Sequence, residues 1–274
     1  MQSLLRIKFV SEQIASDIAD KFNAIIPEFC KNNGKHASRD DVYVFTLSRE
    51  REWQNNQKSI LKILSTFSQI LSYAENNGAL IEVDLGIFLI NYTENEFIEF
   101  DFSNELIQVF AKHNICFGLS IYSINWHPKL QQMKYPMCSH IRILGMNEID
   151  IVEIVSRYRQ LFPDFANNTD GCIIKDKNLS LLLSNENNWD NNHDEILRRI
   201  PVMTPILSDA IDKGAFVELT VSFDMREYQE RNLTAFIFLN TFSKLLSEFS
   251  ISLNVVIFID DHNVPSPKTC SLNN

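Results

Sequence analysis

The chain has 274 residues, of which 45% are hydrophobic and 22% are charged, so it can bury a large core. Only seven residues are glycine, and neither G-x-x-x-x-G-K-[ST] nor G-x-G-x-x-G occurs, which argues against enzymes that hold nucleotide phosphates on glycine-rich loops. The formal net charge of −10 disfavours DNA and RNA binding, because nucleic-acid binders present basic surfaces, and it suits a basic protein partner.

The chain begins with a pattern that predicts a strand followed by a helix. Residues 4–10 form a short apolar run, and apolar side chains then recur at helical spacing from Ile18 to Ile26. Pro27 is expected to end this helix, because proline cannot continue it. Residues 42–47 are rich in β-branched and aromatic side chains and predict a second strand.

The strongest helical pattern of the first half runs from Ile60 to Ala74. Asn55 or Asn56 is expected to cap this helix, and Gly78 to close it in the left-handed conformation. Trp53 lies just before the cap, where an apolar residue can fill the core, so we interpret it as structural.

The remainder of the first half predicts two strands with a helix between them. Residues 80–90 and 115–122 are the strands, and Ser103 can cap the intervening helix. Phe100 and Phe102 alternate in the way that half-buried strand positions do. The half therefore predicts the order β-α-β-α-β-α-β.

The second half repeats the first at a constant offset of 136 residues. Trp189 matches Trp53, Gly214 matches Gly78, and Phe236 and Phe238 match Phe100 and Phe102. We therefore predict an α+β fold made by tandem duplication, in which each module is a mixed or antiparallel sheet with helices packed on it. The expected parts are a first module over 1–124, a connector over 125–138, a second module over 139–262 and a frayed tail over 263–274.

The second copy departs from the first at two prolines. Pro201 and Pro205 fall inside the counterpart of the long helix, and an interior proline costs about 3 kcal/mol or more. We expect this helix to be split, with Thr204 capping the new segment and Pro205 at its first position.

No spacing of histidine, cysteine or serine predicts chemistry. C-x-x-C, H-E-x-x-H and G-x-S-x-G are all absent, and the cluster Asp260-Asp261-His262 places neighbouring side chains on opposite faces. We therefore expect no catalytic residue, no metal, no cofactor and no enzyme activity. Neither a secretory segment nor an apolar run long enough for a membrane span is found, so a cytoplasmic protein without membrane contact is expected.

Two polar segments after the third predicted strand of each half are the candidate partner-binding sites. Both keep a Tyr-x-Glu pattern, in which the tyrosine can supply contact area and the carboxylates can orient a basic partner. The residues expected to bind are Tyr92, Glu94, Glu96, Asp224, Glu227, Tyr228 and Glu230. Residues from Met137 onward carry a net charge of −7 against −3 before it, so the second module or the groove between modules is the expected contact.

One pattern resembles a known family. The tryptophan at position 53, the apolar stripe from Leu61 to Leu71, Gly78-Ala79 and the block from Phe102 to Tyr122 resemble the bacterial domain-of-unknown-function family numbered 4279. The resemblance covers about half of each repeat and is weaker in the second copy. It implies a small bacterial cytoplasmic protein, of a kind found in part among immunity genes of toxin systems, and carries over no catalytic residue.

The first hypothesis is a non-enzymatic binding protein, an immunity protein that neutralises a cognate bacterial toxin by direct binding to a basic toxin domain. One alternative is a small-molecule enzyme or sensor with its site in the cleft between the repeats, where pockets are favoured. Another is a scaffolding protein whose duplication replaces a homodimer, which an exposed apolar patch would favour.

Overall fold

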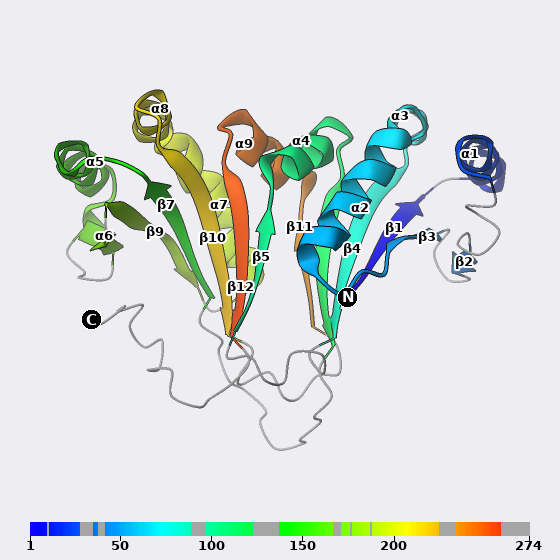
Figure 1. Ribbon diagram of the computed structural model, residues 1–274, viewed down its shortest axis with the longest axis horizontal. Coiled ribbons are helices and arrows are strands. Elements are labelled where there is room, and N and C mark those ends of the chain that lie inside the picture. The colour runs from blue at the N-terminus through cyan, green and yellow to red at the C-terminus, as the bar shows by residue number, and fades with distance from the viewer. Residues whose placement is uncertain are drawn as a thin grey trace, which may run out of the picture. The chain divides into compact units, whose positions relative to one another are not determined.

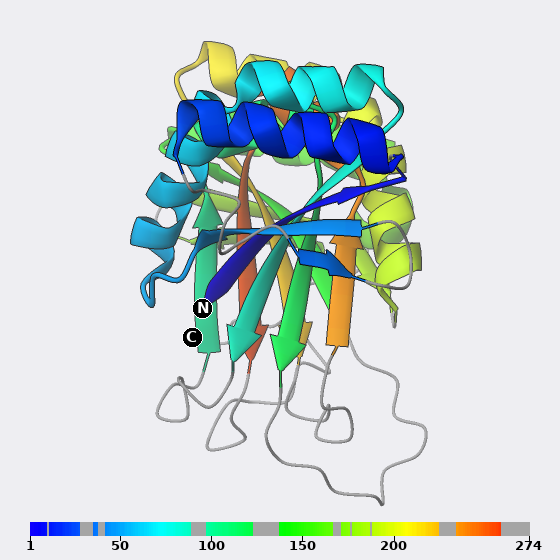
Figure 2. The same cartoon turned by 90° about the vertical axis from the view of Figure 1, so that its right-hand side faces the viewer.

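The computed structural model describes ten stretches of the chain. They are residues 1–9, 11–27, 35–37, 42–88, 97–122, 137–166, 171–175, 177–186, 188–224 and 234–258. The fold is α+β, as predicted, with helices packed on two mixed six-stranded sheets (Figures 1 and 2). The predicted order β-α-β-α-β-α-β is wrong, because each half contains two further strands, one before the second predicted strand and one after the third. Two compact units divide the chain, one with residues 1–91, 105–124 and 231–244, the other with 92–104, 125–230 and 245–274. None of the described helices is both long and apolar enough to cross a membrane.

The first unit contains a sheet in the order β11-β6-β4-β1-β3-β2. Its strands are β1 (Gln2–Lys8), β2 (Lys35–Ala37), β3 (Val42–Ser48), β4 (Leu80–Phe88), β6 (Cys116–Tyr122) and β11 (Thr234–Phe238). Its helices are α1 (Glu12–Ile25), α2 (Trp53–Thr66), α3 (Ser68–Asn76) and α4 (Asn104–Lys112). Strands β4 and β6 run parallel, and the other neighbours run antiparallel.

The second unit contains a sheet in the order β5-β12-β10-β7-β9-β8. Its strands are β5 (Phe97–Phe102), β7 (Met137–Leu144), β8 (Cys172–Lys175), β9 (Asn178–Glu186), β10 (Phe216–Asp224) and β12 (Ser252–Phe258). Its helices are α5 (Glu148–Leu161), α6 (Pro163–Ala166), α7 (Trp189–Val202) and α8 (Thr204–Asp212), while α9 (Asn240–Glu248) passes from the first unit into the second. Strands β10 and β12 are the parallel pair.

The two halves of the sequence exchange a strand. Strand β5 belongs to the first half but pairs with β12 of the second, and β11 belongs to the second half but pairs with β6 of the first. The compact units therefore differ from the expected modules 1–124 and 139–262 by the exchange of these segments. Apart from the exchanged pair, each strand of the first sheet has a counterpart about 136 residues later at the same place in the second sheet. That a duplication produced this order stays a prediction.

The long helix is interrupted in both halves, and this corrects the prediction that only the second copy is split. Helix α2 ends before Phe67 and α3 follows it, just as α7 and α8 meet at Met203. Phe67 and Met203 are equivalent positions and are fully buried. The break thus coincides with a core side chain in each copy, and Pro201 is accommodated inside α7.

The expected caps are also corrected. Helix α2 begins at Trp53, after Glu52, so neither Asn55 nor Asn56 is the cap. Asn56 is instead buried and accepts a 2.5 Å hydrogen bond from Ser3 Oγ. In the second copy Asn188 caps α7, and the residue before α8 is Met203 rather than Thr204.

Each sheet has helices on one face and polar side chains on the other, and this polar face is also buried along the central strands. In β1, Leu5 and Ile7 are buried against the helices while Arg6 and Lys8 lie on the other face. The predicted alternation of phenylalanines is confirmed. On the helix-covered face of the first sheet, the ring of Phe238 stacks on that of Phe117 with centroids 4.3 Å apart. All eight residues interpreted from sequence as core or helix-closing keep those roles. Buried are Trp53, Trp189, Phe100, Phe102, Phe236 and Phe238, and left-handed are Gly78 and Gly214.

Candidate functional site

Most of the predicted partner-binding residues lie outside the described part of the chain. Tyr92, Glu94 and Glu96 fall between β4 and β5, and Glu227, Tyr228 and Glu230 fall between β10 and β11. Asp224 is the last residue of β10, in register with Phe258 of β12, and its side chain is not described. Both segments therefore begin at the carboxyl end of a parallel strand and lead to an exchanged strand.

Aromatic side chains gather at these strand ends. Phe88 and Tyr122 are neighbours in register at the ends of β4 and β6, and their rings stack with centroids 4.7 Å apart. In the second unit Phe97 and Phe258 are neighbours with centroids 6.2 Å apart, and Phe97 is 44% exposed. Half-exposed aromatic rings offer rigid contact area, which is the chemistry that protein interfaces favour.

The polar face of the first sheet carries a buried ion-pair network. Arg6 on β1 donates to Glu82 at 2.8 Å and also to Asp84, both on β4, and Lys8 donates to Glu82 at 2.6 Å. Ser120 on β6 donates to Asp84 at 2.6 Å. The carboxylates are almost fully buried, and these donors replace the hydrogen bonds that they would make to water.

The same face of the second sheet is less charged. Arg142 donates to Glu218 at 2.8 Å, and Thr220 donates to the same carboxylate at 3.2 Å. Burial raises the pKa of Glu218, and the Arg142 guanidinium opposes that rise. Thr220 occupies the position of Asp84, so the second sheet lacks one of the two acids.

Two polar side chains on this face lack partners among the described residues. His140 Nε2 and Asn254 Oδ1 are both enclosed without a hydrogen bond, and Asn254 is 3% exposed. They flank Thr220 on β10, one from β7 and one from β12. Burial lowers the pKa of His140 to about 4, with Arg142 contributing, so this ring is neutral at pH 7.

We expect His140 to destabilise the fold in acid. An unfolded histidine titrates near pH 6.5, so between pH 6.5 and 4 only the unfolded state takes up this proton. The free energy of unfolding should fall across this window by about 3 kcal/mol at most, with the full stability present above pH 6.5. Urea unfolding of the wild type and of His140→Gln at pH 7 and pH 4.5 checks this. An equal acid loss in both proteins would contradict it.

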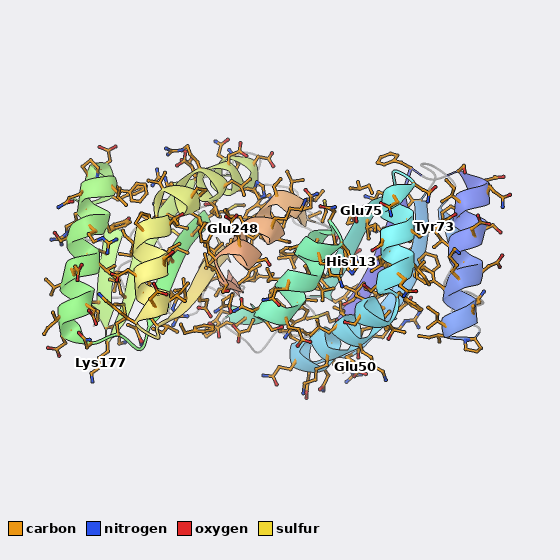
Figure 3. The ribbon with its side chains drawn as sticks, turned by 90° about the horizontal axis from the view of Figure 1, so that it is seen from above. Glu50, Tyr73, Glu75, His113, Lys177 and Glu248 are labelled. Atoms are coloured by element: carbon orange, nitrogen blue, oxygen red, sulfur yellow. The ribbon has the colours of Figure 1, made fainter. Side chains whose placement is uncertain are left out.

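Burial shifts the pKa values of a further histidine and of two thiols among the described residues. His113 shares a 2.9 Å hydrogen bond with Ser68 Oγ between α4 and α3, and burial lowers its pKa (Figure 3). Burial raises the pKa of the Cys116 and Cys172 thiols, which disfavours the reactive thiolate. No cluster of three metal-ligating side chains occurs in the stretches that the structure describes, and Asp260-Asp261-His262 falls outside them.

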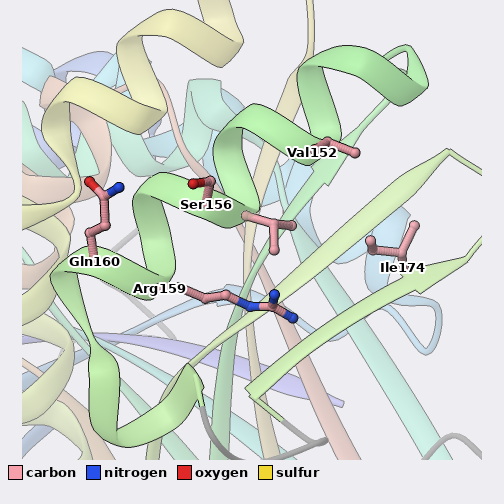
Figure 4. A pocket seen from close by; sticks show the side chains of 6 residues that line it. Val152, Ser156, Arg159, Gln160 and Ile174 are labelled. Atoms are coloured by element: carbon pink, nitrogen blue, oxygen red, sulfur yellow. The ribbon is translucent and has the colours of Figure 1, made fainter.

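A groove between α5 and β8 is a site that sequence reasoning missed. Its volume is about 520 Å³. Figure 4 shows α5 presenting side chains to it, with Arg159 extended toward the β8–β9 hairpin and Ile174 opposite. Its lining residues are Val152, Val155, Ser156, Arg159, Gln160 and Ile174. Val152 is an apolar residue outside the buried stripe of α5. An apolar residue off the helical stripe is the sequence feature that could have indicated this groove.

Comparisons with known proteins leave the resemblance to the 4279 family as a prediction. No protein-family model matches the chain, and a search of curated proteins finds no similar sequence.

Proposed function

We propose that the chain is a non-enzymatic cytoplasmic binding protein of the immunity type, which neutralises a bacterial toxin by binding a basic domain of it. The observation that carries this proposal is the pair of aromatic contacts at the strand ends, Phe88 with Tyr122 and Phe97 with Phe258. Phe88 and Phe97 flank the segment after β4 in the sequence, and Phe258 is in register with Asp224, which precedes the segment after β10. Aromatic rings therefore lie next to the strand ends at which the predicted carboxylates begin.

This combination supports tight and fast binding of a basic surface. Buried aromatic residues contribute a large share of the binding energy of protein complexes. A loss of this binding energy mainly raises the rate of dissociation. Carboxylates at the edge of such a patch steer an oppositely charged partner and raise the rate of association. The net charge of −10 acts in the same direction.

The test measures binding of the purified chain to the product of its neighbouring gene, by biolayer interferometry, at 50 and 300 mM salt. Reversing Asp224, Glu227 and Glu230 to lysine should slow association at least about tenfold at low salt. Phe97→Ser should speed dissociation instead. Growth of cells that co-express the partner should depend on the wild-type chain.

The matched control reverses three exposed acids elsewhere in the second unit, Asp164, Asp212 and Glu248, so that net charge changes equally. Equal slowing by both sets would show that only net charge matters and would contradict the placement at the strand ends. A chain that binds without protecting cells from the partner would contradict the immunity role.

A further inference from the structure

Strand β8 forms the edge of the second sheet among the described strands, pairing only with β9. The outward N–H and C=O groups of such a strand can pair with another extended chain. Ile174 lies opposite Leu179 on the helix-covered face, and Lys175 lies opposite Asn178 on the other. An added strand would therefore present alternate side chains to α5 and to Lys175.

The helix-covered side of this edge offers an apolar surface. Val152 on α5 is 68% exposed and Ile174 on β8 is 55% exposed, and they line the same groove with Val155 (Figure 4). Single exposed apolar residues need no explanation, but two across a groove beside an open strand edge match the requirements for strand addition.

The charge around the groove selects its occupant. The acidic side chains of α5 that face α8, Asp150 and Glu153, form ion pairs with Lys213 at 2.9 and 3.5 Å. Arg159, by contrast, lines the groove and has no ion-pair partner among the described residues, and the same is true of Lys175 on β8. Lys177 lies farther away, beside Glu148 and Asp150. Two cations at this edge attract carboxylates and repel the same edge of a second copy.

We propose that the α5–β8 groove binds an extended segment of a partner protein whose side chains alternate between apolar and acidic, added as a strand to β8. Its apolar side chains pack between Val152 and Ile174, and its carboxylates, on the opposite face of the added strand, pair with Lys175. The positive charge of Arg159 in the groove attracts the acidic segment. This surface is distinct from the segments after β4 and β10, so the inference does not rest on the proposed function.

The test uses the full chain and two capped heptapeptides, acetyl-EVEVEVE-amide and acetyl-KVKVKVK-amide, titrated calorimetrically at 50 mM salt. The acidic peptide should bind at least about tenfold more tightly than the basic one, and less tightly as salt is raised. Hydrogen exchange at the amides of Cys172–Lys175 should slow when it binds, because strand addition gives them new acceptors.

Val152→Asp and Arg159→Glu should each weaken the acidic peptide at least about tenfold. Both side chains are exposed, so the fold should be retained. Val202→Asp is the matched control, since Val202 is an exposed valine on α7 of the same unit. Equal binding of the two peptides, no binding at millimolar peptide, or unchanged exchange in β8 would overturn the proposal. The proposal would also be overturned if the wild-type chain formed a dimer that Ile174→Asp abolishes, because a second copy would then occupy the groove.

Discussion

A chain cut between its two halves should stay together as one folded particle. Cleavage at a protease site inserted within residues 125–134 leaves β5 attached to the first half and β11 to the second, while each completes the sheet of the other. The side chains buried across this exchange are Ile98, Phe100, Phe102, Phe236 and Phe238. At about 1.5–3 kcal/mol for each, their burial contributes roughly 8–15 kcal/mol before the entropy of association is subtracted.

Gel filtration of the cut protein at micromolar concentration should therefore give a single peak that separates only in denaturant. Phe100→Ser together with Phe102→Ser should allow the halves to separate, because β5 then loses the side chains that hold it in the second sheet. Two folded halves that separate from the cut protein without denaturant would contradict the exchange.

A disulfide test distinguishes the exchanged fold from its unexchanged alternative. Glu99 on β5 lies opposite Val256 on β12. Ser120 on β6 holds the equivalent position of the first sheet, where β5 would pair without exchange. In a background free of native cysteines, Glu99→Cys with Val256→Cys should cross-link, because paired strand residues lie within disulfide reach. Cross-linking of Glu99→Cys with Ser120→Cys instead would show the unexchanged fold.

The exchange shows what the sequence could and could not predict. Apolar periodicity located β1, β3, β4 and β6 and the buried phenylalanines, because burial on one face imposes that pattern. It could not say which sheet β5 joins, since β6 and β12 present similar apolar edges. The break at Phe67 was missed for a related reason. The stripe from Ile60 to Ala74 continues through the kink, because both helices bury the same face.

The candidate site was predictable only in part. Tyrosine and glutamate in the segments after β4 and β10 stood out by their repetition, but neither periodicity nor composition indicates which strand becomes an edge. The groove beside β8 depends on that edge and on the tilt of α5 over it. The unpartnered His140 and Asn254 likewise lie 114 residues apart in sequence and meet only through the register of three strands.

The ion pairs on the first sheet should be the most sensitive polar residues of the fold. Among the described residues, Arg6→Met leaves Asp84 with only Ser120 as a donor and Glu82 with only Lys8, at positions where the carboxylates are nearly inaccessible. Removing one partner of a buried ion pair typically costs about 3–5 kcal/mol. The low end, about 3 kcal/mol, is expected here because Lys8 remains and Arg6 is partly exposed.

Arg142→Met is the matched comparison in the second sheet, where one carboxylate is involved and 40% of the arginine side chain is exposed. It should cost about 1–2 kcal/mol, since the raised pKa of Glu218 shows that this acid takes up a proton more readily. Urea unfolding at pH 7 measures both. Arg6→Met combined with Asp84→Asn should recover part of the loss, because the amide removes the uncompensated charge and still accepts from Ser120. If both arginine substitutions lowered the free energy of unfolding by the same small amount, the buried carboxylates would be stabilised by water and not by the arginines.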